Sequence, residues 1–126
     1  MQITASTLAL TVEDVTTSAA FLRRHFGYAE EMSADGFVSL KHDGGGVDVV
    51  YLRRGIEVLP ESYRHDTAAG VILVFVVDDL AGEEKRLRGE GVEITMPLRE
   101  EPWGEKLFQV TDPNGVVIEL VEWAKQ

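Results

Sequence analysis

The sequence predicts an α+β domain made of two copies of one β-α-β-β-β module. Val12-Glu13-Asp14-Val15 recurs as Val77-Asp78-Asp79-Leu80 with a shift of 65, and both segments join an apolar strand to a helix. Asp43 through Leu52 recurs as Asp112 through Val121 with a shift of 69, and both segments open on a turn. Because only two copies of a long unit are present, we expect a closed domain with pseudo-twofold symmetry rather than a repeat array.

The first module opens on a strand at Thr7–Val12, where Leu8, Leu10 and Val12 alternate with smaller or polar residues. Asp14 is typical of a helix N-cap, and Gly27 is typical of the residue that ends a helix. Between them, apolar residues recur at helical spacing. Three more strands, separated by Asp- and Gly-rich turns, are expected at Tyr28–Ser33, Phe37–Lys41 and Val47–Leu52.

The second module begins with the continuous apolar run Val71–Val77, which predicts a strand buried on both faces. A helix at about Leu80–Arg88 follows, ended by Gly89 and Gly91. The remaining strands are expected at Val92–Met96, Lys106–Thr111 and Val116–Trp123. The polar stretch before this module shows no clean period. We therefore predict one domain of residues 1–126, with module one at 1–55, a linker at 56–69 and module two at 70–126.

Composition narrows the classes of function. A chain of 126 residues is long enough to bury one core, and without cysteine it has neither disulfides nor thiolate chemistry. With 22 acidic and 12 basic residues, the net charge of -10 opposes nucleic-acid binding. We find no signal-peptide pattern and no apolar run of the ~20 residues that span a bilayer. The expectation is a cytoplasmic protein that binds neither nucleic acid nor membrane.

The order of elements, the Val-x-Asp helix openings and the segment Pro102–Phe108 followed by Asp112-Pro113-Asn114-Gly115 resemble the vicinal oxygen chelate superfamily. That superfamily includes glyoxalase I, extradiol dioxygenases and bleomycin-resistance proteins. The resemblance implies a U-shaped mixed β-sheet around a central cavity. It also implies a homodimer, with modules that pair within one chain or exchange between chains. A fold of this kind carries several unrelated activities, so it does not define the function by itself.

The resemblance also indicates where a metal would bind. In metal-using relatives, four ligands come from the first and last strands of the two modules. The corresponding residues here are Thr7, Val50, Ile72 and Glu119, which provide one good donor. A divalent ion requires several imidazole or carboxylate donors, and adding the nearby Asp48 supplies no nitrogen. We therefore expect no metal and no cofactor.

The three histidines do not change that expectation. His25 falls late in the first helix, where a residue on the polar face that complements the helix dipole is the simplest interpretation. His42 lies beside a tight turn. His65 lies in the linker, where it is able to close over a pocket.

Trp103 is the strongest candidate for ligand binding, because core packing rarely requires a tryptophan in a Pro-Trp-Gly loop. The resemblance to bleomycin-resistance proteins implies that such an aromatic residue stacks on a planar drug. For Phe37 and Phe108 a core or dimer role is an equal alternative. The other expected ligand-binding residues are Glu119 and Thr7 on cavity-lining strands, together with Phe37, Asp48, Tyr63, Phe108 and Trp123.

Four functions follow from these residues. The first is a metal-independent antibiotic-binding protein that sequesters a planar aromatic or cationic natural product and so confers self-resistance. The second is a metal-independent enzyme, a glyoxalase-like lyase or isomerase or a dioxygenase-type enzyme, with Glu119 as general base. The third is a metal-dependent lyase or dioxygenase, which the four ligand positions disfavour. The fourth is a non-catalytic interaction module.

Overall fold

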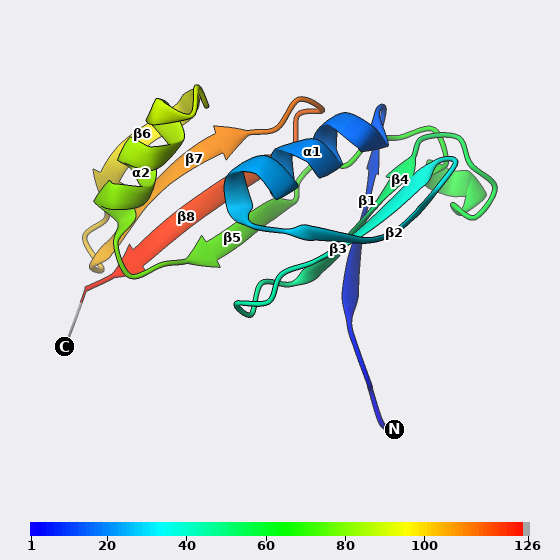
Figure 1. The fold of residues 1–126 in the computed structure, drawn as a ribbon, viewed down its shortest axis with the longest axis horizontal. Coiled ribbons are helices and arrows are strands. Elements are labelled where there is room, and N and C mark those ends of the chain that lie inside the picture. The colour runs from blue at the N-terminus through cyan, green and yellow to red at the C-terminus, as the bar shows by residue number, and fades with distance from the viewer. Residues whose placement is uncertain (125–126) are drawn as a thin grey trace. The chain divides into compact units, whose positions relative to one another are not determined.

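The structure is a computed structural model that describes residues 1–124. The chain divides into two compact units, the first spanning Met1–Ala69 and the second beginning at Gly70. Each unit contains one α-helix and one four-stranded mixed sheet (Figure 1), which confirms the predicted α+β class. No helix in the described part of the chain has the length and hydrophobicity needed to cross a lipid bilayer.

Module one contains β1 (Thr7–Val12), α1 (Val15–Phe26), β2 (Ala29–Ala34), β3 (Phe37–Lys41) and β4 (Asp48–Arg53). Its strands lie in the order β1-β4-β3-β2, with β1 parallel to β4 and the other pairs antiparallel. The helix packs on the sheet through β3 and β4. Each strand and the helix lie within a residue or so of the range that the sequence predicts.

The two ends of α1 follow from local chemistry. The Asp14 carboxylate accepts hydrogen bonds from the backbone N–H groups of Thr16 and Thr17, at 3.1 and 3.4 Å. The Thr16 hydroxyl donates to the same carboxylate and lowers the pKa of Asp14. Gly27 ends the helix in the left-handed region at φ 72°, which glycine adopts without steric cost. The predicted N-cap and C-terminal glycine are confirmed.

The core of module one lies between α1 and the sheet. Its fully buried side chains include Leu22 of the helix and Leu40, Val49 and Tyr51 of the sheet. His25 is buried as well, with its imidazole 5.1 Å from the ring of Phe21. The prediction that His25 lies on the polar face of the helix is therefore wrong, because the helix turns it toward the core side.

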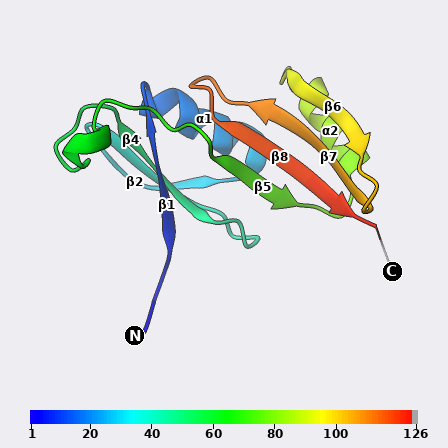
Figure 2. The same cartoon turned by 180° about the vertical axis from the view of Figure 1, so that it is seen from behind.

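Module two contains β5 (Ile72–Val76), α2 (Leu80–Gly89), β6 (Ile94–Glu100), β7 (Glu105–Thr111) and β8 (Val117–Trp123). Its order, β5-β8-β7-β6, matches that of module one, and β5 runs parallel to β8 (Figure 2). The helix packs against β6, β7 and β8. Leu80 and Leu87 of α2 are fully buried there, together with Phe108 and Ile118 of the sheet.

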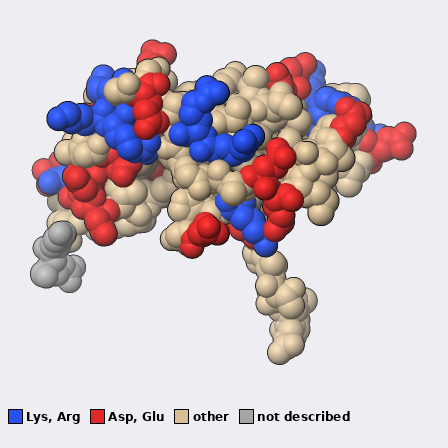
Figure 3. Space-filling view, viewed as in Figure 1, with Lys and Arg blue, Asp and Glu red and all other residues tan. Residues whose placement is uncertain are grey.

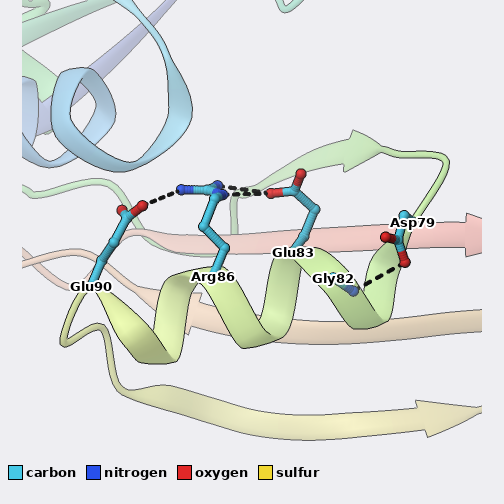
Figure 4. Close-up of polar contacts among 5 residues, drawn as sticks. All are labelled: Asp79, Gly82, Glu83, Arg86 and Glu90. Carbon is cyan, nitrogen blue, oxygen red and sulfur yellow. Dashed lines mark hydrogen bonds and ion pairs between the residues drawn. The ribbon is translucent and has the colours of Figure 1, made fainter.

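The solvent side of α2 is held by charge pairs. Asp79 caps the first turn by accepting from the Gly82 N–H at 3.1 Å. One turn on, the Arg86 guanidinium bridges Glu83 at 2.8 Å and Glu90 at 2.9 Å (Figure 4). Basic and acidic side chains are interspersed over this helix (Figure 3). Such exposed pairs add a few tenths of a kcal/mol each, about 0.3–0.5, so packing of the apolar face stabilises α2 more than its charges do.

The strand pairing confirms the internal repeat. Thr7 lies opposite Asp48 in module one, and Ile72 lies opposite Val117 in module two. These two pairs are related by the same shifts of 65 and 69 that the sequence shows. Val50 and Glu119 therefore hold equivalent places on the last strands of their modules.

One prediction about β5 is wrong. The apolar run indicates a strand buried on both faces, but Ile72, Val74 and Val76 are 48%, 50% and 66% exposed. The intervening Leu73 is buried on the α2 side. The strand lies at the edge of its sheet, and α2 covers one face only. Exposed valines on the other face are a feature that burial within the module does not explain.

The stretch expected as a linker packs onto module one. It contains a short 3₁₀-helix, Glu61–Tyr63, and the buried side chain of Leu59. Backbone hydrogen bonds tie it to the module, from the Ala68 N–H to the Thr11 carbonyl at 2.7 Å and from the Gly55 N–H to the Arg64 carbonyl at 2.8 Å. The sequence shows no period there because single residues, rather than a regular face, make these contacts.

Candidate functional site

The candidate site is the face of the module-two sheet opposite α2, termed here the distal face. Alternation along β7 and β8, together with their register, assigns side chains to it without ambiguity. Most of these side chains are aliphatic, and the polar ones lie near the middle and at both ends. The distal face comprises Ile72, Val74, Val76, Glu105, Leu107, Gln109, Thr111, Val117, Glu119, Val121 and Trp123.

A polar pair occupies the middle of the distal face. The Gln109 amide donates from Nε2 to Oε1 of Glu119 at 2.8 Å, and the pair is partly buried. The two residues lie directly opposite each other on β7 and β8. The amide fixes the orientation of the carboxylate, and the second carboxylate oxygen remains able to accept a hydrogen bond. One oriented acceptor in an apolar wall is the arrangement that orients a small organic ligand.

Two tryptophans and a carboxylate lie at one end of the distal face. Trp103 donates its indole N–H to Oε1 of Glu105 at 3.1 Å, and its side chain is 65% exposed. Glu105 lies opposite Trp123, which is 48% exposed. We refer to Trp103, Glu105 and Trp123 as the Trp–Glu–Trp cluster. Exposed indoles beside a carboxylate offer both a stacking surface and a negative charge.

The backbone holds the loop of Trp103 against the sheet. Gly104 takes φ 91°, which a side chain would strain, and its carbonyl accepts from the Ala124 N–H at 3.0 Å. The Glu101 N–H donates to the Glu105 carbonyl at 2.7 Å and closes the turn. Trp103 is therefore presented from an anchored turn just before the start of β7 and not from a long loop.

The predicted residues of module one lie on the equivalent face of their own sheet, opposite α1. Thr7 lies opposite Asp48 at one end, and Phe37 lies opposite Leu52 at the other. Val50 is between them on β4. Tyr63 belongs to the 3₁₀-helix and is half exposed.

Phe108 requires a correction. Its side chain is fully buried on the α2 side of the sheet, opposite Leu120. Neighbouring residues on a strand point to opposite faces, so Phe108 is in the core while Gln109 is on the distal face. Of the two roles that the sequence allows for Phe108, the structure assigns the core.

The donor set does not fit a metal. Of the four ligand positions, Thr7 and Val50 lie on module one and Ile72 and Glu119 on module two, and three of them offer an alcohol or a hydrocarbon. Pairing the modules within a chain or between chains leaves this set of residues unchanged. Among residues 1–124, no group of three or more His, Cys, Asp and Glu side chains is arranged to hold an ion.

His42 has a structural role. Its Nδ1 accepts from the Gly44 N–H at 2.9 Å and closes the turn before β4. Its ring also lies 5.1 Å from that of Tyr28.

Sequence reasoning missed two site residues, Glu105 and Gln109. Both are polar residues in a strand of mixed polarity, and only their cross-strand partners show that they belong to the distal face. The available signal was the antiparallel register that the final hairpin imposes: counting outward from its turn sets Gln109 opposite Glu119 and Glu105 opposite Trp123.

The sequence matches the Glyoxalase/Bleomycin resistance protein/Dioxygenase superfamily over residues 4–120. The chain belongs to this superfamily, and the family resemblance of the sequence is confirmed. No curated protein matches the sequence significantly.

Solved structures show the same fold. A lactoylglutathione lyase from Agrobacterium tumefaciens is 20% identical with a TM-score of 0.75, covering 97% of this chain and 96% of its own. TioX from Micromonospora sp. ML1 is 21% identical with a TM-score of 0.74, covering 97% and 100%. A glyoxalase/bleomycin resistance protein/dioxygenase from Nocardioides is 21% identical with a TM-score of 0.76, covering 99% and 86%. At this identity the likeness extends to the fold alone.

Proposed function

We propose that this protein binds a planar organic molecule without a catalytic metal and acts by sequestering it, as an antibiotic-binding self-resistance protein of the bleomycin-resistance type. The observation that carries the proposal is the composition of the distal face of module two. It combines exposed aliphatic side chains, two exposed indoles and one oriented carboxylate. The four positions that hold a metal in metal-using relatives supply a single good donor.

The apolar exposure supports a binding role. Ile72, Val74 and Val76 leave about half or more of their surface in water. Full burial of such a side chain stabilises a protein by roughly 1.5–3 kcal/mol, and each of these exposed side chains forgoes part of that free energy. A flat ligand that covers these side chains and stacks on Trp103 gains free energy from burial of apolar surface. It also gains about 0.5–1.5 kcal/mol from the aromatic contact, in addition to the area that the contact buries.

The polar pair supports orientation of the ligand. Because Gln109 already donates to one carboxylate oxygen of Glu119, a ligand N–H or O–H that reaches the other oxygen completes the site. Binding of this kind needs no residue to gain or lose a proton.

The test is a titration of metal-free protein. Protein treated with a chelator and desalted is screened with planar aromatic antibiotics by thermal shift, and the compound that stabilises it most is titrated by calorimetry. We expect stoichiometric binding, and the extracted ligand unchanged in mass after prolonged incubation. Retention of one equivalent of zinc, nickel, manganese or iron by the untreated protein, required for binding, would contradict the proposal.

The Glu119→Gln variant separates sequestration from catalysis. If the protein only binds, the wild type and the variant both return the ligand unchanged, and the variant binds more weakly because the acceptor loses its charge. Product formed by the wild type and absent with Glu119→Gln would establish the general-base enzyme instead.

Homodimerisation and a cytoplasmic location belong to the same proposal. β5 is an edge strand with a row of exposed apolar side chains, and native proteins usually cover such an edge, here by a second copy of the chain. The chain contains no cysteine, so it has no disulfide that an oxidising compartment would have to form. Sedimentation equilibrium and cell fractionation test the two points.

A further inference from the structure

We propose that the Trp–Glu–Trp cluster is a subsite for an organic cation, and that it selects planar ligands carrying a positive charge over neutral ones. This inference rests on the proposed function and names the chemistry of one end of that site. It is carried by the surroundings of Glu105 and by the two indoles beside it.

Glu105 has a hydrogen-bond donor but no counter-ion. Its carboxylate accepts a hydrogen bond from the indole N–H of Trp103, at 3.1 Å. Across the part of the chain that the structure describes, no salt bridge involves Glu105. The nearest basic residue on the neighbouring strand, Arg99, is bound to Glu101 at 2.6 Å. Among residues 1–124, the Glu105 carboxylate therefore forms no ion pair with a basic side chain.

Module one has no such carboxylate at the corresponding place. Asp35, which the repeat aligns with Glu105, belongs to the turn between β2 and β3 and not to a strand. It is bound by both guanidinium nitrogens of Arg53, at 2.8 and 3.2 Å, and Arg53 lies opposite Val12 on the α1 side of its sheet.

The last strand of module two follows the same alternation. The shift of 69 sets Glu122 at the place of Arg53, and Glu122 also faces the helix, where it accepts from the backbone N–H of Leu80 at 3.0 Å, at the start of α2. The Trp–Glu–Trp cluster, on the distal face, is therefore a feature of module two and not of the repeat.

The indoles complete the recognition of a cation. The electron-rich faces of tryptophan attract ammonium and guanidinium groups more strongly than those of other aromatic residues. Trp123 lies directly opposite Glu105, in a pair whose side chains approach closely, and Trp103 is hydrogen-bonded to it. A neutral ligand would gain the stacking alone. A cationic ligand would gain the same stacking together with attraction to the electron-rich ring faces and to the negative charge of Glu105.

The experiment compares two dyes of the same ring size by equilibrium dialysis. At mildly alkaline pH, 9-aminoacridine is cationic and acridine is neutral. We expect the wild-type protein to bind 9-aminoacridine about tenfold more tightly or better, which is the effect of a cation–π contact reinforced by a carboxylate. Raising the salt concentration should reduce this preference, because the charge pair is exposed.

The variant Glu105→Gln keeps an acceptor for the Trp103 indole and removes the charge. It should bind the two dyes equally, with its affinity for acridine unchanged. The matched control is Glu93→Gln, which removes the same charge from an exposed residue outside the cluster and should keep the preference. A preference that survives in Glu105→Gln overturns the assignment of the cluster.

The outcomes separate this inference from the proposed function. Equal binding of both dyes by the wild type overturns the cation subsite and leaves planar binding standing. Failure of the wild type to bind either dye contradicts the proposed function together with the inference. If Glu105→Gln does not fold, the wild type decides: benzyltrimethylammonium chloride should displace 9-aminoacridine more than sodium chloride of equal ionic strength does, and equal displacement overturns the proposal.

Discussion

The two modules share one backbone plan and differ in what their faces carry. In each, the first strand pairs in parallel with the last, in equivalent register, and a single helix covers one side. On the uncovered side, Val50 and Ser39 of module one stand where module two has Glu119 and Gln109. At the end of this side module two also carries the Trp–Glu–Trp cluster, whereas the Asp35–Arg53 ion pair of module one lies on the α1 side of its sheet.

The difference teaches where function was added to this fold. The repeat preserves which strand positions are buried and where the turns fall, because these determine whether each sheet forms. It does not preserve the face opposite the helix, whose side chains are free to change without disturbing the core. Module two presents an acceptor pair, two indoles and a carboxylate on this face, and these residues are the basis of the proposed binding function.

The largest expected effect concerns the two cores. Phe108 of module two and Val38 of module one hold equivalent buried positions. Phe108→Ala should lower the free energy of unfolding by about 3–5 kcal/mol, because a large cavity remains. Val38→Ala removes two methyl groups and should cost about 1.5–3 kcal/mol. Urea unfolding of both variants measures the ratio, and a negligible effect of Phe108→Ala would contradict its placement in the core.

The two turns before the last strands give a sharper test. In module two the buried Asp112 accepts from the N–H groups of Asn114 and Val116, at 2.8 and 2.9 Å. In module one the equivalent turn is closed by His42, and Asp43 is exposed. Asp112→Ala should therefore cost about 2–3 kcal/mol of unfolding free energy, and Asp43→Ala under about 0.5. Equal costs for the two variants would show that the turns are held alike.

Tyr28 gives module one a sensitivity to alkali. Burial, reinforced by the charge of Asp48, raises the pKa of Tyr28 to about 12. The unfolded chain ionises this phenol near pH 10, about two units earlier. Its contribution to stability is therefore full below about pH 10 and is lost as the pH rises through about 12.

Tyr28→Phe removes both this dependence and the hydrogen bond that the hydroxyl donates to the Val47 carbonyl at 2.8 Å. It should cost about 1 kcal/mol of unfolding free energy at neutral pH, with a smaller difference from the wild type at high pH. Unfolding curves recorded across the alkaline range measure this, with Tyr63→Phe as the exposed control. A constant difference at every pH would show that Tyr28 does not titrate as assigned.

Much of the fold was predictable because it depends on local sequence signals, and these occur in both copies of the repeat. Asp14, Gly27 and the turn at Asp112–Gly115 each act within a few residues, so their roles can be read along the chain. The register then follows from the length of the final hairpin. What local signals miss is which face stays uncovered: the run at Val71–Val77 is equally apolar on both sides, and exposure depends on where the helix packs.

The candidate site was predictable only in part. Trp103 stands out because its loop gives a tryptophan no reason to be in a core, and the structure leaves it exposed. Glu105 and Gln109 do not stand out in the sequence, because their roles in the candidate site depend on their partners on the neighbouring strand. Phe108 illustrates the converse, since an aromatic residue near a motif is a ligand candidate until the alternation of the strand places it on the buried side.

The central claim is that Trp103 serves a ligand and not the fold, and one paired measurement tests it. Trp103→Ala is compared with the wild type by chemical unfolding and by titration with the planar compound that the screen returns. The account predicts an affinity weaker by about 1–3 kcal/mol, from lost stacking and apolar burial, and little loss of stability because the side chain is largely exposed. The contradicting result is unchanged affinity together with a loss of about 3–5 kcal/mol in unfolding free energy, which is what truncating a core tryptophan costs.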